Sequence, residues 1–115
     1  MEHLNRIELR GNVGNVKMLS GSDKPAAFFS LATSKAYNGK DGNPVIETTW
    51  HNILAFEGKN IRDLQTLAKG DKVYVVGRIR NHKITGPDGV ERNRDEVLAS
   101  RVTRIDAEEP LSCEL

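Results

Sequence analysis

The sequence predicts an all-β domain, a small barrel of five strands with one short helix. Three observations lead to this prediction. Short stretches of alternating apolar and polar residues recur along the chain, clusters of Gly, Pro, Asn and Asp separate them, and only one stretch has helical spacing. With 115 residues, the chain is long enough to form one domain with its own hydrophobic core.

Five stretches have the alternation of a β-strand. They are residues 4–18, 26–37, 45–56, 71–84 and 90–105. The first contains Gly11 and Gly14, and two glycines inside one strand indicate a bulge or a sharp bend. The connections at 20–25, 38–44 and 85–89 are rich in turn-forming residues.

The one stretch with helical spacing is residues 58–69. Its apolar residues, at i, i+3, i+6 and i+7, are Ile61, Leu64, Leu67 and Ala68. Gly70 stands where the glycine after a helix is expected. The spacing therefore predicts a helix between the third and fourth strands.

The order of the elements narrows the fold. Three strands, a helix and two strands, with a bent first strand, fit the OB-fold, a five-stranded Greek-key barrel, although periodicity alone also permits other small barrels. In the fourth strand we expect the inward-facing residues to be Val73, Val75, Gly77 and Ile79.

The third strand carries the most informative pattern. Because side chains alternate along a strand, one face holds Trp50, Asn52, Leu54 and Phe56, and the other holds His51, Ile53 and Ala55. The second face is an ordinary core face. Two aromatic rings on the opposite face suit the stacking of unpaired nucleic-acid bases. The alternative is a core position for Trp50, the single Trp of the chain.

The fourth strand predicts a basic face. Its outward residues are Tyr74, Val76, Arg78, Arg80 and His82, and Lys83 follows. Two arginines on one face can neutralise successive phosphates or stack on bases. The alternative is a solvated face on which Arg78 and Arg80 pair with surface carboxylates. Arg92 and Arg94 have the same parity as each other and extend the basic strip.

Composition and charge limit the possible functions. Residues 1–105 hold all 17 Lys and Arg against 12 Asp and Glu, whereas residues 106–115 hold four acids and no base, which is compatible with binding a polyanion. Cys113 is the single cysteine, so no disulfide or zinc framework forms within one chain. No catalytic motif occurs, and we expect a non-enzymatic protein without metal or cofactor.

The chain resembles the bacterial single-stranded DNA-binding protein family. Four segments carry the resemblance, in family order and spacing: Leu4-Asn-Arg-Ile-Glu-Leu-Arg-Gly-Asn-Val-Gly14, Phe29-Ser-Leu-Ala-Thr-Ser34, Glu47-Thr-Thr-Trp-His-Asn-Ile-Leu-Ala-Phe56 and Leu67-Ala-Lys-Gly-Asp-Lys-Val-Tyr-Val-Val-Gly-Arg-Ile-Arg80. The resemblance implies an OB-fold that binds single-stranded DNA without sequence preference, in replication, recombination or repair.

The resemblance also implies which residues contact DNA. The family's base-stacking positions fall on Tyr37, Trp50, Phe56 and Ile84, and the family usually has Trp at the last of these. Family phosphate contacts fall on Arg80 and His82. Our full set of candidate DNA-binding residues adds Lys35, Asn52, Arg78 and Lys83. Phe28 matches no family role, and we expect it at a surface or interface.

For assembly, the resemblance implies a homotetramer, with a dimer as the alternative. An uncovered edge strand invites pairing, so we expect the 4–10 edge to pair with a second subunit through Leu4, Arg6 and Glu8. His51 matches a family histidine at a subunit interface.

The C-terminus departs from the family pattern. We assign residues 1–106 to the OB domain and 107–115 to a short acidic tail, which lacks the long linker and acidic tip that recruit replication and repair proteins. A primosome-type or scaffold OB protein that acts through protein contacts is the alternative function, and RNA binding uses the same surface. The sequence shows neither a signal peptide nor an apolar run of about 20 residues, so we expect a cytoplasmic, nucleoid-associated protein.

Overall fold

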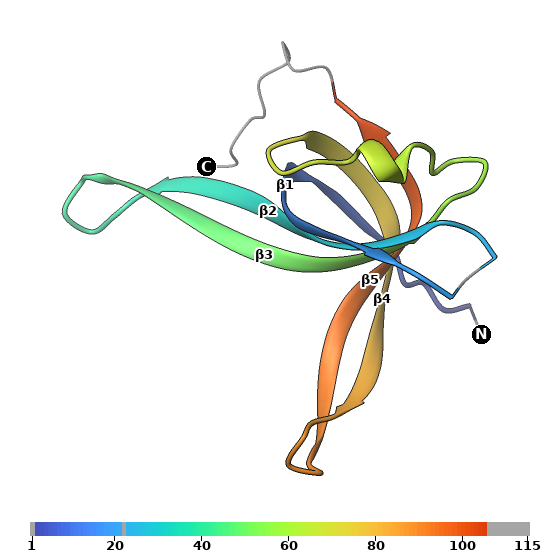
Figure 1. Cartoon of the computed structure of the whole chain (residues 1–115). Coiled ribbons are helices and arrows are strands. Elements are labelled where there is room, and N and C mark those ends of the chain that lie inside the picture. The colour runs from blue at the N-terminus through green and yellow to red at the C-terminus, as the bar shows by residue number, and fades with distance from the viewer. Residues whose placement is uncertain (1, 22, 106–115) are drawn as a thin grey trace.

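The predicted strands close into a five-stranded barrel in the computed structural model, which describes residues 2–21 and 23–105 (Figure 1). The strands are β1 (Ile7–Leu19), β2 (Ala26–Asn38), β3 (Pro44–Phe56), β4 (Lys72–Thr85) and β5 (Glu91–Arg104). They follow one another around the barrel in the order β1-β2-β3-β5-β4, and only the β3–β5 pair is parallel. The five-stranded barrel prediction is therefore confirmed.

β1 serves both halves of the barrel because it bends. Its residues 7–12 pair with β4 and its residues 12–19 pair with β2, and the second register shifts between Val13 and Val16. A Cβ atom at Gly11 would lie 2.0 Å from the carbonyl oxygen of Ala32, so only glycine allows the two strands to approach this closely. The predicted bulge in this strand is confirmed.

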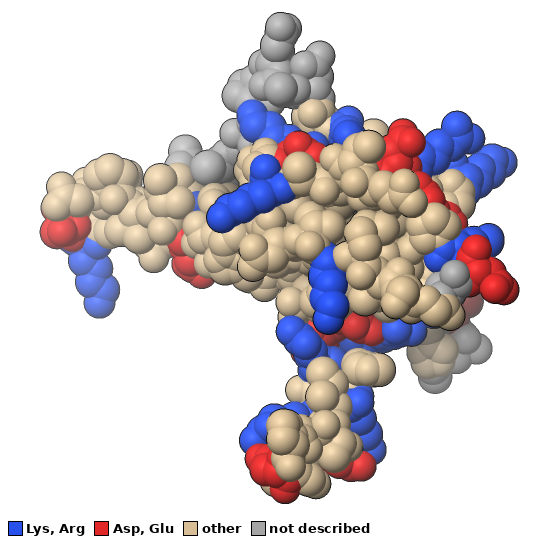
Figure 2. Space-filling model, in the orientation of Figure 1, with Lys and Arg blue, Asp and Glu red and all other residues tan. Residues whose placement is uncertain are grey.

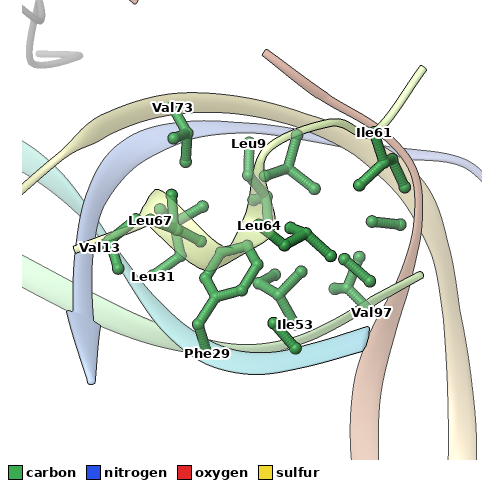
Figure 3. Close-up of a cluster of buried hydrophobic side chains, with 14 residues drawn as sticks. Leu9, Val13, Phe29, Leu31, Ile53, Ile61, Leu64, Leu67, Val73 and Val97 are labelled. Carbon is green, nitrogen blue, oxygen red and sulfur yellow. The ribbon is translucent and has the colours of Figure 1, made fainter. Parts of the chain in front are cut away.

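The barrel is filled by apolar side chains from every strand and from the 58–70 segment (Figure 3). The ten labelled residues are Leu9, Val13, Phe29, Leu31, Ile53, Ile61, Leu64, Leu67, Val73 and Val97. Ile53 and Ala55 are fully buried, which confirms that their side of β3 is the core face.

The predicted helix over 58–69 is wrong. The segment contains a single 3₁₀ turn, η1 (Leu64–Thr66), preceded by Asp63 in the left-handed region at φ 59°. Its backbone bonds elsewhere: Ile61 forms a bridge to Val102, and the Leu64 amide donates to a carboxylate oxygen of Glu57. The apolar spacing reflects burial instead, because Ile61, Leu64 and Leu67 point into the barrel.

Two hairpins extend beyond the barrel, the β2–β3 arm and the β4–β5 arm (Figure 1). β4 is buried at alternate positions only as far as Gly77. The prediction that Ile79 faces the core is wrong, because β4 has left the barrel there and the side chain is 45% exposed. Ile79 instead bonds through its backbone to Asn5, whose side chain donates to its carbonyl at 2.6 Å and accepts from its amide at 3.0 Å.

The predicted tail at 107–115, including Cys113, lies outside the described residues. Within residues 2–21 and 23–105, no helix is long and apolar enough to cross a membrane. Over those same ranges, no three His, Cys, Asp or Glu side chains gather into a metal-binding group.

Candidate nucleic-acid interface

Trp50 and Phe56 lie on the outer face of the sheet that β1, β2 and β3 form. Residues paired across antiparallel strands project to the same side, so the register defines this outer sheet face row by row. The rows are Phe56–Ala26–Leu19, Leu54–Phe28–Lys17, Asn52–Ser30 and Trp50–Ala32. The predicted face of β3 is therefore one strip of a wider, three-stranded surface.

Trp50 is seated on the bulge of β1 and is 60% exposed. A Cβ atom at Gly14 would lie 2.7 Å from Cζ3 of the indole and 2.5 Å from Oγ of Ser30. Glycine at this position therefore lets the indole lie against the sheet while its remaining surface faces solvent. The alternative of a core position for Trp50 is wrong.

Phe56 lies at the other end of the same strip and is 41% exposed. Asn52 and Leu54 lie between the two rings on β3 and are half-buried. On the opposite face of the strand, the neighbouring Ile53 and Ala55 are fully buried in the core. This arrangement presents two separated π-faces to solvent.

The outer sheet face continues onto the β4–β5 arm. Leu54 pairs with Leu98 of β5, and Leu98 pairs with Arg78 of β4. The next pairs on this side of the arm are Arg80–Glu96, His82–Arg94 and Ile84–Arg92. Figure 2 shows Lys and Arg side chains gathered where this arm leaves the barrel, with acidic atoms between them. The strand register therefore places Trp50 and Phe56 on one continuous surface with Arg78 and Arg80.

Arg78 and Arg80 differ in their partners. Nε of Arg80 lies 2.6 Å from Oε1 of Glu96, whose side chain is only 7% exposed. Arg78 is exposed and makes no ion pair with any described residue. The pairing with a carboxylate that the sequence left open therefore applies to Arg80 and not to Arg78.

Three candidate residues lie on the reverse faces of the arms. Lys83 pairs with Asn93, which places it on the side of the β4–β5 arm opposite Arg80. Lys35 and Tyr37 pair with Glu47 and Val45, opposite Trp50 on the β2–β3 arm. Lys35 lines a hollow of about 590 Å³ between that arm and β1, and Tyr37 is 39% exposed. The structure does not bring these residues onto the outer sheet face.

The residues that we expect at a subunit interface, His51 excepted, lie around the start of β1. Leu4 is 89% exposed and, like Arg6, precedes the strand, which begins at Ile7. The Tyr74 hydroxyl donates to Glu8, and this hydrogen bond raises the pKa of Tyr74. Residues 7–11 pair with β4 on one side, whereas pairing with β2 begins only at Asn12. Among the described strands, one edge of this stretch is left open.

His51 is half-buried on the core side of β3. Its Nε2 lies 2.8 Å from Oγ1 of Thr33 on the neighbouring strand. Burial lowers the pKa of His51 below its ordinary value of 6.5, because the charged imidazolium loses hydration there. The neutral form is therefore favoured in the folded chain.

The structure also brings together two residues that the sequence analysis did not connect, Phe28 and Arg94. Phe28 is half-buried on the outer sheet face, and the guanidinium carbon of Arg94 lies 5.4 Å from the centroid of its ring. Arg94 thus reaches from the β4–β5 arm to β2. Only the strand register, which the sequence does not contain explicitly, reveals that Phe28 lies beside Leu54 and Phe56.

Comparison with known proteins gives a consistent match over the described barrel. Residues 4–105 match the model of the single-strand binding protein family. The single-stranded DNA-binding protein of Neisseria meningitidis serogroup A is 34% identical over 105 residues, which cover 89% of this chain and 60% of that protein. The mitochondrial single-stranded DNA-binding protein of Drosophila melanogaster is 32% identical over 102 residues, covering 86% and 69% respectively.

Solved structures agree with the fold. A Plasmodium falciparum SSB in complex with ssDNA has a TM-score of 0.71 and 32% identity, and the match covers 92% of this chain and 98% of that one. A small single-stranded DNA-binding protein from Streptomyces coelicolor, with a TM-score of 0.65 and 22% identity, supports the fold alone. The chain spans about three fifths of the length of several bacterial relatives that it matches, the Neisseria protein among them.

Proposed function

Because the chain belongs to the single-strand binding protein family, we propose that it binds and protects single-stranded DNA without sequence preference. The observation that carries the proposal is the outer sheet face, where Trp50 and Phe56 are exposed above a buried core and the surface continues to Arg78. The relatives and the solved structure described above are single-stranded DNA-binding proteins, and they do not favour the scaffold alternative. Replication, recombination and repair are the processes in which this family acts.

Stacking and charge contribute separately to this activity. Bases stack on Trp50 and Phe56, since every base has a π-face and the contact is indifferent to sequence. Arg78 neutralises a phosphate, whereas Arg80 shares its charge with Glu96. Ile84, 36% exposed on the same side of the arm, offers apolar contact without a π-face. Asn52 and His82 lie on the same surface, between these contacts.

The residues on the reverse faces act where the DNA passes around the arms. A DNA strand that leaves the outer sheet face and wraps the protein then reaches Lys35, Tyr37 and Lys83. Such wrapping suits an assembly with several linked sites, because each later site binds at a high effective concentration. We propose a homotetramer, with the open edge of β1 and its residues Leu4, Arg6 and Glu8 at a subunit contact.

We propose that the protein is a non-enzymatic DNA-binding protein that acts in the cytoplasm, in association with the nucleoid.

Substitution of the two rings tests the proposal. Trp50→Ala and Phe56→Ala should each cost about 1–3 kcal/mol of affinity for single-stranded DNA, a range measured in the protein family to which this chain belongs. Binding is followed by the anisotropy of a dye-labelled oligo(dT), in competition with poly(U) and duplex DNA at two salt concentrations. A folded Trp50→Ala variant that binds as tightly as the wild type would remove the stacking role, and equal affinity for duplex would remove the function.

A further inference from the structure

Phe28 is the third aromatic side chain on the outer sheet face. It pairs with Leu54, and the next row of the register holds Phe56. Successive rows are two residues apart along a strand, or about 7 Å. Phe28 is therefore one row from Phe56 and two rows from Trp50, between the two rings in the direction of the strands.

Two positively charged side chains lie next to this ring. Lys17 of β1 is the cross-strand partner of Phe28 on the side away from Leu54. Arg94 of β5 places its guanidinium over the ring. Within residues 2–21 and 23–105, Arg94 forms no ion pair, so its charge is not committed to a carboxylate.

The contact between Arg94 and Phe28 is one that a nucleotide can replace. A cation–π contact at an exposed site is weak, and a base offers the ring a larger stacking partner. The displaced guanidinium binds phosphate oxygens in bidentate fashion. When a DNA strand lies across the outer sheet face, Phe28 therefore contacts a base and Arg94 contacts a phosphate.

We propose that Phe28 and Arg94 form an additional nucleotide-binding position, in which a base stacks on Phe28 in place of the guanidinium and Arg94 moves to a neighbouring phosphate. The proposal rests on the proposed function and extends it. The position joins the rings of the outer sheet face to the β4–β5 arm, where Ile84 supplies no aromatic ring.

The test compares single variants of the full chain in oligo(dT) binding over a series of salt concentrations. Phe28→Leu, which keeps an apolar side chain, should lower the affinity at least about fivefold and leave the salt dependence unchanged. Arg94→Gln should reduce the slope of log K against log salt by about 0.7, the value for one phosphate on a single strand. Arg62→Gln is the matched control, because it removes an equal charge from the exposed part of the 58–70 segment.

A second measurement uses the wild-type chain and so does not depend on how a variant folds. Ultraviolet cross-linking to an oligonucleotide that contains 5-iododeoxyuridine, mapped by mass spectrometry, should label Phe28 as well as Trp50. Absence of a cross-link at Phe28, or a Phe28→Leu variant that binds like the wild type, overturns the proposal. If Trp50→Ala still weakens binding in that case, the proposed function stands; if it does not, both fail together.

Discussion

Gly14 controls where the indole of Trp50 lies. In Gly14→Ala the added Cβ would lie 2.7 Å from the indole and 2.5 Å from Ser30, so both side chains must move. We expect a loss of about 1–3 kcal/mol in the free energy of unfolding, as for other overpacked sites, together with a shifted Trp emission and weaker binding of oligo(dT). Urea titration, emission spectra and anisotropy measure the three effects.

The matched control is Gly58→Ala, because no described atom lies within 4 Å of a Cβ atom at that glycine. It should leave the emission spectrum and the affinity unchanged. If Gly14→Ala also leaves both unchanged, the indole is not fixed by the bulge of β1.

His51 makes stability depend on pH. Its pKa is lower in the folded chain than the ordinary 6.5, because burial disfavours the imidazolium. Below pH 6.5 the unfolded chain binds more protons at this histidine than the folded chain does. The stability that the neutral imidazole contributes is therefore complete above pH 6.5 and is lost as the pH falls through the pKa of the folded chain. Lowering the pH from about 7.5 to about 5.5 should therefore reduce the urea midpoint more in the wild type than in His51→Gln. Equal losses in the two proteins would contradict this assignment.

At the level of an element, the β4–β5 arm carries two arginines with different duties. Arg80→Ala leaves the nearly buried Glu96 without its partner and should cost about 1–3 kcal/mol in the free energy of unfolding. Arg78→Ala should leave stability unchanged but lower the salt slope of DNA binding by about 0.7. Urea titration and salt-dependent anisotropy on the two variants separate the roles.

These two variants serve as controls for each other, since both remove one charge from the same side of the arm. Equal unfolding free energies for both would show that the contact with Glu96 contributes nothing to stability. An unchanged salt slope in Arg78→Ala would remove that residue from the phosphate path.

At the level of the whole molecule, the open edge of β1 predicts self-association. Light scattering at tens of micromolar should give four times the 12.8 kDa mass of the chain. With His51 placed at a subunit boundary, as the family resemblance implies, His51→Tyr should weaken assembly before it weakens DNA binding, most visibly on dilution. Thr48→Tyr adds similar bulk on the opposite face of β3 and should leave the mass unchanged.

A monomer at that concentration would exclude the tetramer, and a stable dimer would favour the smaller assembly. Dissociation caused equally by Thr48→Tyr would show that bulk anywhere on the β2–β3 arm is sufficient, and His51 would lose its special place.

Residue order was sufficient to predict the features that depend on neighbours along the chain. Alternation is a property of an extended backbone, so the strands, the core face of β3 and the exposure of Trp50 and Phe56 followed from residue order. The glycines of β1 predicted its bend for a similar reason, since a residue without Cβ inside a strand indicates that another part of the chain approaches the backbone closely. The family resemblance connected these single residues to the surface that we propose binds DNA.

Features that depend on pairing between strands could be read only from the folded chain. Apolar spacing in 58–69 cannot distinguish a helix from a segment that closes a barrel, and the bridge from Ile61 to Val102 settles the choice. Alternation continues after a strand has left the core, so Ile79 is exposed despite its inward parity. The meeting of Arg94 and Phe28, 66 positions apart, depends on how the arm leaves the barrel. Local residue order fixes which side a residue faces, but only strand register and the barrel's closure fix what it meets there.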